Sequence, residues 1–202
     1  MLAHARVAVP WALVLVCSVM IVVMLALLGR WPGQTWALGG VAVGALAGAV
    51  AWCLDEPLAE IVGAAARHLR WRLASQGLGV AVLAMVWVAA VMVLGGDLFG
   101  RRSDLVLQGL AAMVAVGGMT AWLRSRGSGH PGRVLAPYVV LISAGLAITR
   151  PLARQLPLFP LPYEGPWAAS RVLWVLLAGI GVGALLLAVT DARWRRRPVS
   201  PR

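Results

Sequence analysis

The amino-acid sequence predicts an all-α, polytopic membrane protein with about six transmembrane helices, and three features support this: composition, apolar runs and arginine placement. Of the 202 residues, 61% are hydrophobic and only 12% are charged, whereas a soluble domain carries roughly 25% charged residues. The surplus apolar surface is expected to face lipid, where helices are the default spanning element because they satisfy their own backbone hydrogen bonds. Residues 1–202 are predicted to form a single transmembrane domain.

The apolar runs match the length that a bilayer requires. A hydrocarbon core about 30 Å thick is crossed by roughly 20 apolar residues in a helix. The first run follows His4 and Arg6 as the apolar part of a signal peptide would, but it exceeds the roughly 7–15 residues of such a segment, and we interpret it as a span. Six spans are predicted, at about 10–29, 36–54, 78–96, 105–123, 134–149 and 171–190.

The basic residues predict the orientation. All eighteen are arginines, a usage typical of a high-GC bacterial genome, and cytoplasmic segments accumulate positive charge. Twelve arginines fall in alternate segments on one side and six on the other, so both termini are predicted to lie on the cytoplasmic side of a bacterial plasma membrane. The tryptophans agree, because all but Trp87 fall at predicted span ends, where this residue is enriched at membrane interfaces.

Glycines line one face of two predicted spans. In the second span they recur at every fourth residue, and the sixth span repeats the spacing. Small residues in this pattern let helix backbones approach closely. The pattern predicts either packing against a neighbouring helix of the same chain or a seam between two copies, at Gly40, Gly44, Gly48, Gly179 and Gly183.

The missing lysine and the positions of the cysteines and histidines argue against most kinds of covalent chemistry. The chain has no lysine, so it lacks both the phosphate-binding GxxxxGK[ST] loop and a Schiff-base residue. Cys17 and Cys53 fall inside apolar runs, and the three histidines lie outside the spans. No catalytic residue, disulfide or metal site is therefore predicted. The seven acidic residues lie at span ends or in loops, which argues against a proton or sodium relay inside the membrane.

The arginine clusters also bear on partners. They lie between apolar runs rather than on one basic face, so nucleic acid is not an expected partner. The run from Arg193 to Arg197 predicts contact with anionic membrane lipids.

The segment from Leu54 to Gly77 is too charged to span a membrane and too long for a turn. Asp55 or Glu56 is placed to cap a helix whose first turn contains Pro57, a position that needs no amide donor. A cytoplasmic helix over about 56–73 is predicted, with an apolar stripe on one side and Glu60, Arg67 and Trp71 on the other. The segment is either a link lying in the membrane interface or a docking helix for a partner protein.

The order of these elements resembles that of type-2 ABC exporter permeases: six spans, an amphipathic cytoplasmic helix between the second and third, and a longer outer segment before the last. The stretch LDEP…R..RWR, from Leu54 to Arg72, is similar to the corresponding segment of such permeases in high-GC bacteria. The amino-terminal MLAHARVAVP is shorter than the connecting helix with which the family usually begins.

The resemblance implies that the helix between the second and third spans is a coupling helix, seated in a groove of a separate ATP-binding cassette ATPase subunit. ATP and Mg²⁺ are then expected in that partner, and no cofactor in this chain. The resemblance also implies a homodimer or a related permease chain as a second partner. The residues implied to contact the ATPase are Asp55, Glu56, Pro57, Glu60, Arg67, Arg70 and Trp71.

Other interpretations stay open. A substrate-binding membrane subunit of a vitamin-type importer would contact its partner through small residues on its spans, which the glycines of the second span could provide. A non-transporting membrane assembly subunit fits the sequence nearly as well. A small membrane enzyme is disfavoured, because intramembrane catalysis needs a pair of catalytic residues or a metal cluster at depth.

Residues 150–170 form a proline-rich outer segment. Five prolines in this stretch exclude a regular spanning helix. The segment is predicted to be either a re-entrant or lid element, or an ordered loop anchored by Phe159, Tyr163 and Trp167.

Overall fold

The computed structural model describes residues 10–55, 69–94, 101–150, 155–161 and 166–194. In these segments every regular element is a helix and no strand occurs, which confirms the predicted all-α class. Five of the helices are long and apolar enough to cross a membrane: α2 (Trp11–Arg30), α6 (Leu69–Leu94), α7 (Arg102–Ser125), α8 (Pro131–Thr149) and α9 (Trp167–Trp194). Helix α4 (Ala37–Cys53) is apolar but has 17 residues, and the short α3 (Pro32–Thr35) precedes it.

Each predicted span overlaps one of these helices, and the largest difference is at α6. This helix has 26 residues and begins at Leu69, so the last part of the helix predicted over 56–73 continues directly into the third span. Residues 56–68 lie outside the described part of the chain. At about 1.5 Å per residue α6 is roughly 39 Å long, which exceeds a hydrocarbon core of about 30 Å.

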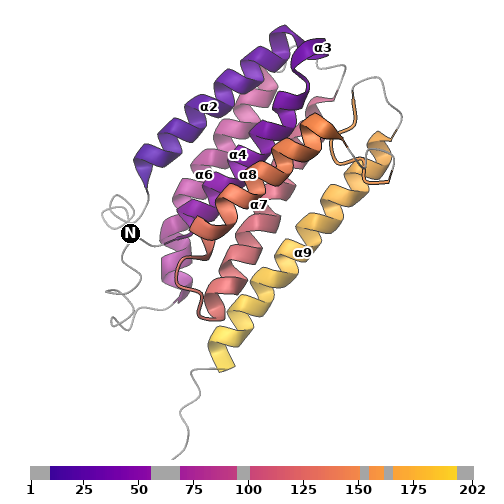
Figure 1. Cartoon of the computed structure of the whole chain (residues 1–202). Coiled ribbons are helices and arrows are strands. Elements are labelled where there is room, and N and C mark those ends of the chain that lie inside the picture. The colour runs from indigo at the N-terminus through magenta and orange to yellow at the C-terminus, as the bar shows by residue number, and fades with distance from the viewer. Residues whose placement is uncertain (1–9, 56–68, 95–100, 151–154, 162–165, 195–202) are drawn as a thin grey trace, which may run out of the picture.

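The long helices alternate in direction along the bundle (Figure 1). At one end the indole N–H of Trp36, just before α4, donates to the carbonyl of Pro160 at 2.9 Å. At the other end Asp55, just after α4, accepts a hydrogen bond from the backbone N–H of Gly132 in α8 at 3.0 Å. We call these the outer end and the inner end, following the orientation that the arginines predict.

Helix α4 lies at the centre of the bundle, packed against α2, α6, α7 and α8 (Figure 1). Thirteen of its 17 residues are buried. Glycine and alanine make up most of its sequence, so four neighbours can approach a narrow helix. Helices α2 and α9 instead expose large apolar side chains, as surfaces that face lipid do, including Leu15, Val16, Val19, Val23, Val172, Val175, Leu176, Ile180 and Leu186.

The glycines of the second span pack against α8. A Cβ atom added at Gly44 would lie 2.6 Å from the Cβ of Ser143, and one at Gly48 would lie 2.9 Å from Cγ2 of Val140. Gly40 meets Ala147 in the same way. The Ser143 hydroxyl donates to the Gly40 carbonyl at 2.7 Å, a bond between helices that only a close approach permits. Of the two predicted roles, packing within the chain is the one that these three glycines serve.

The glycines of the last span behave differently. No described atom lies within 4 Å of a Cβ added at Gly179 or Gly183. Gly181, between them, is the residue that packs, because its backbone presses against Val114 and Ala115 of α7 while Gly118 presses against the carbonyl of Gly181. The α7 and α9 backbones therefore meet at Gly118 and Gly181. Of the two predicted roles of Gly179 and Gly183, packing within the chain is wrong, and a seam between two copies stays a prediction.

Replacing Gly44 with leucine is expected to destabilise the fold, because the added side chain would collide with Ser143 of α8. The expected loss is about 1–3 kcal/mol or more. Gly145→Leu on α8 is the matched control, since nothing lies within 4 Å of a Cβ at Gly145 and its effect is expected to stay within about 0.5 kcal/mol. Unfolding of both variants in detergent, followed by circular dichroism, tests this; equal stability would contradict the close α4–α8 contact.

Candidate functional site

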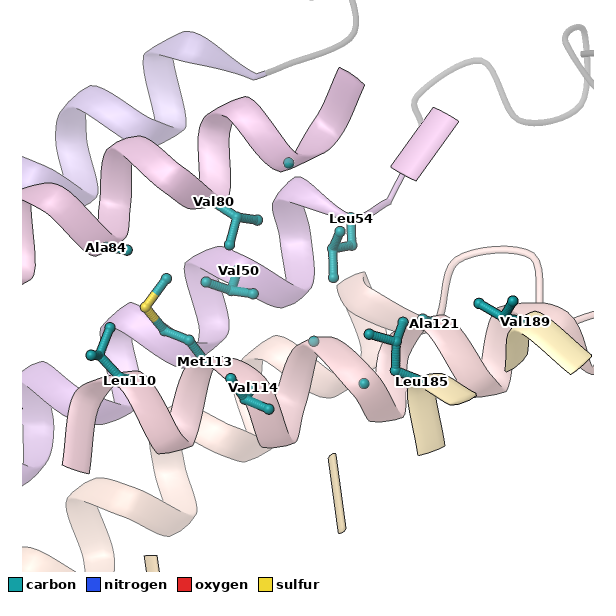
Figure 2. A pocket seen from close by; sticks show the side chains of 13 residues that line it. Val50, Leu54, Val80, Ala84, Leu110, Met113, Val114, Ala121, Leu185 and Val189 are labelled. Carbon is teal, nitrogen blue, oxygen red and sulfur yellow. The ribbon is translucent and has the colours of Figure 1, made fainter. Parts of the chain in front are cut away.

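An apolar groove of about 690 Å³ lies between four of the described helices (Figure 2). Helices α4 and α7 form its floor, and α6 and α9 flank it on opposite sides (Figure 2). This volume falls within the roughly 300–1,000 Å³ of ligand pockets. We call it the α6–α9 groove. Its lining is Val50, Leu54, Gly77, Val80, Ala84, Leu110, Met113, Val114, Gly117, Gly118, Ala121, Leu185 and Val189.

Glycines give the groove part of its depth. A Cβ at Gly77 of α6 would have no atom within 4 Å, and one at Gly117 of α7 would only reach ordinary contact, 3.5 Å from Leu54 and from Val50. A larger side chain at either position would therefore enter the groove without displacing a helix. Every described residue of the lining is apolar, so this part of the groove suits a hydrocarbon and offers no side chain for acid–base chemistry.

The inner end of α4 is held by its two neighbours. A guanidinium nitrogen of Arg124, at the end of α7, donates to the Leu54 carbonyl at 2.5 Å, and a cation is favourable at a helix carboxyl end. The Asp55 carboxylate accepts from the backbone N–H groups of Gly132 and Arg133, at 3.0 and 2.6 Å. A carboxylate is favourable at the start of a helix for the same electrostatic reason. We call these two contacts the inner clamp.

The inner clamp corrects the prediction for Asp55. The sequence places this residue as the cap of the following helix or as a contact for the ATPase, whereas the structure buries it to 3% exposure against the start of α8. Both of its oxygens are engaged there, so we remove it from the partner-facing set. Arg70 and Trp71 lie in the first turns of α6. The other predicted contacts, Glu56, Pro57, Glu60 and Arg67, lie outside the described residues.

Three tryptophans fasten the outer segment to the bundle. The indole N–H groups of Trp36 and Trp174 donate to the carbonyls of Pro160 and Leu158, at 2.9 and 3.0 Å, and that of Trp167 donates to the Leu161 carbonyl at 3.1 Å. Pro157 and Pro160 are buried. Residues 155–161, the described part of the proline-rich segment between Arg150 and Pro166, therefore form a loop anchored by aromatic side chains. Tyr163, one of the predicted anchors, lies outside the described residues.

The ring of Phe159 continues this anchoring inside the bundle. It lies edge-on to Trp174, with ring centroids 5.7 Å apart, and 3.3 Å from the position of a Cβ at Gly40. The loop thus reaches the glycine face of α4.

A charged pair joins α7 to α9 beneath that loop. Arg171 binds the carboxylate of Asp104 through two nitrogens, at 2.5 and 3.3 Å, and a nitrogen of Arg101 lies 3.8 Å from the same carboxylate. Asp104 is only 4% exposed and lies in the first turn of α7, where a negative charge is favourable. The sequence alone did not predict this pair, because no local pattern connects two charges 67 positions apart.

Trp87, the tryptophan that the sequence places in mid-span, is a core residue. It is fully buried, and its indole N–H donates to the Leu105 carbonyl at 3.2 Å. Gly109 lies directly against the indole ring, where a Cβ would collide with it. The donor of Trp87 is thus satisfied by α7 instead of the membrane interface, which explains why it departs from the pattern of the other tryptophans.

Replacing Asp55 with alanine is expected to lower the stability of the isolated chain, because the start of α8 loses its capping carboxylate. The expected cost is about 1–2 kcal/mol. Asp55→Asn keeps one oxygen acceptor and is expected to lose less. Thermal unfolding of the purified chain, without any ATPase present, is the measurement; a wild-type transition for Asp55→Ala would rule out the inner clamp.

The Asp104–Arg171 pair is expected to stabilise the outer end. A double-mutant cycle with Asp104→Ala and Arg171→Ala is predicted to give an interaction energy of about 0.5–3 kcal/mol. The lower part of that range is expected, because the Arg171 side chain is 52% exposed and solvent screens exposed pairs. Chemical unfolding in detergent of both single variants and the double variant measures it, and strictly additive effects would mean that the pair contributes nothing.

Comparison with known proteins adds no family to this description. No protein-family model, curated protein sequence or solved structure matches the chain. The functional argument therefore depends on the geometry. That geometry is of an all-α polytopic membrane protein whose central helix is clamped at its inner end and bordered by an apolar groove.

Proposed function

We propose that this chain is the membrane-spanning permease subunit of an ATP-driven exporter, and that a separate ATP-binding cassette subunit engages the connection between α4 and α6. The observation that carries the proposal is where this connection is attached. It leaves the inner end of α4, which is buried over most of its length, and enters α6, which forms one wall of the α6–α9 groove. A partner that moves the connection acts on the groove directly.

The inner clamp determines which helix moves in this proposal. Arg124 and Asp55 tie the end of α4 to α7 and α8, so a displacement of the connection is transmitted to α6. Because α6 borders the groove opposite α9, its movement changes the width of the groove. ATP and Mg²⁺ are bound in the partner, and this chain supplies an apolar path for an apolar or amphipathic compound.

The main alternative within transport loses the feature on which it was based. A vitamin-type importer subunit would be expected to contact its partner through Gly40, Gly44 and Gly48. These glycines are covered by α8, so their face is occupied within the chain. The exporter proposal does not need that face, since it places the partner at the inner end.

Reversing two charges in the connection tests the ATPase partnership. The double variant Glu60→Lys, Arg67→Glu keeps the net charge and is expected to lower co-purification of the ATP-binding cassette subunit by at least about tenfold, or about 1.4 kcal/mol. The partner is identified by its phosphate-binding loop sequence and by Mg²⁺-dependent ATPase activity. Quantitative mass spectrometry of the complex, purified from native membranes through a tagged permease chain, gives the ratio of the two subunits.

The control for this experiment is Arg197→Glu, a charge reversal in the carboxy-terminal arginine run that is expected to leave the ratio unchanged. An unchanged ratio in the double variant would sink the coupling assignment. If the complex forms but no compound ever stimulates its ATPase activity, the non-transporting assembly subunit becomes the better description.

A further inference from the structure

We propose that the α6–α9 groove holds one hydrocarbon chain of an anionic phospholipid from the leaflet at the inner end, with the lipid phosphate beside Arg124. This goes beyond the proposed function, because it assigns a resident lipid to this chain whether or not an ATPase is bound. The groove is a feature of a single copy, lined by four of its helices.

The size of the groove favours a hydrocarbon chain over a helix of another protein. A helix with its side chains is about 10–12 Å across and rises 5.4 Å per turn, so each turn fills roughly 400–600 Å³. The groove, at about 690 Å³, holds little more than one such turn. A lipid chain is much thinner and is already present at this depth of the membrane. Left empty, the groove would cost its lining side chains their packing contacts on one side.

The described lining selects an apolar occupant. Valine, leucine, alanine, methionine and glycine make up all thirteen described positions, and the close-up shows the labelled side chains coming from α4 and the residue after it, α6, α7 and α9 (Figure 2). Gly77 leaves open space on the α6 wall. An occupant with polar groups inside the groove would lose hydrogen bonds that no lining side chain replaces.

Arg124 follows the groove-facing residues of α7 at the inner end. On α7 the groove-facing residues recur every three or four positions, from Leu110 through Val114 and Gly117 to Ala121, and Arg124 is the next position on that face. Its guanidinium contacts the carbonyl of Leu54, itself a lining residue. The cation therefore lies where the apolar groove reaches the inner end, and basic pockets between spans at this level bind anionic lipid head groups.

Native mass spectrometry of the full chain in mild detergent tests the proposal with defined lipids. The chain is titrated with phosphatidylglycerol, with phosphatidylcholine of the same acyl chains, and with glycerol phosphate, which has the anionic head group but no chains. The wild-type chain is expected to bind one phosphatidylglycerol about fivefold more tightly than phosphatidylcholine, the preference that one arginine near the surface provides. Glycerol phosphate is expected not to compete.

Filling the groove separates it from the general lipid-facing surface. Gly117→Leu on α7 and Ala84→Leu on α6 are each expected to weaken phosphatidylglycerol binding by at least about tenfold. Gly145→Leu adds the same side chain to an open face of α8 outside the groove and is expected to change nothing. Arg124→Gln is expected to remove the preference for the anionic lipid, and Arg124→Lys to retain it.

Several outcomes would overturn the proposal. Equal lipid binding by Gly117→Leu, Ala84→Leu and Gly145→Leu would mean that only surface lipid is bound. Competition by glycerol phosphate would mean that the chain binds only the head group and that the groove holds no hydrocarbon chain. If the chain forms a dimer and Gly117→Leu dissociates it, the occupant of the groove is a second copy of the chain. The ATPase partnership is tested separately, because the groove variants are expected to keep the cassette subunit, and the Glu60→Lys, Arg67→Glu variant to keep the lipid.

Discussion

The close contact between α4 and α8 is the constraint on which the rest of the structure depends. Three glycines let the two backbones meet, and the Ser143 hydroxyl donates across the contact to the Gly40 carbonyl at 2.7 Å. In lipid there is no hydrophobic driving force between helices, so close packing and such hydrogen bonds supply the association. Because α8 covers the glycine face of α4, the remaining faces of α4 are left for α2, α6 and α7.

The two ends of α4 are then fixed by polar contacts with distant parts of the chain. At the outer end Trp36 holds the proline-rich loop, and at the inner end Arg124 and Asp55 join α4 to α7 and α8. A rigid central helix confines any adjustable element to the periphery, where α6 and α9 border the groove. This arrangement connects the two proposals, since a partner acting on α6 would act on the wall of the same groove that holds the lipid chain.

Local sequence signals predicted the helices well and their partners poorly. Each of the six predicted apolar runs coincides with a helix to within a few residues, apart from the extended start of α6, and five of these helices are long enough to span a membrane. A run of this length reflects the thickness of the bilayer, which local sequence records directly. Glycines spaced four residues apart correctly identified the packing face of α4. In α9 the same pattern pointed to Gly179 and Gly183, whereas Gly181 is the residue that packs, because the contact depends on the position of Gly118 in α7. Asp55 was assigned to the helix after it, since the start of α8, 77 residues away, leaves no trace in the local sequence.

The sidedness of the chain tests the central claim, that the α4–α6 connection lies at the same membrane surface as the clamped inner end. Cys17 and Cys53 are first replaced, and single cysteines are introduced at Glu60, at Ser128 between α7 and α8, and at Leu156 in the outer loop. A membrane-impermeant maleimide is predicted to label the cysteine at position 156 in intact cells, and those at positions 60 and 128 only after the membrane is opened. Labelling of positions 60 and 128 from opposite sides would contradict the account.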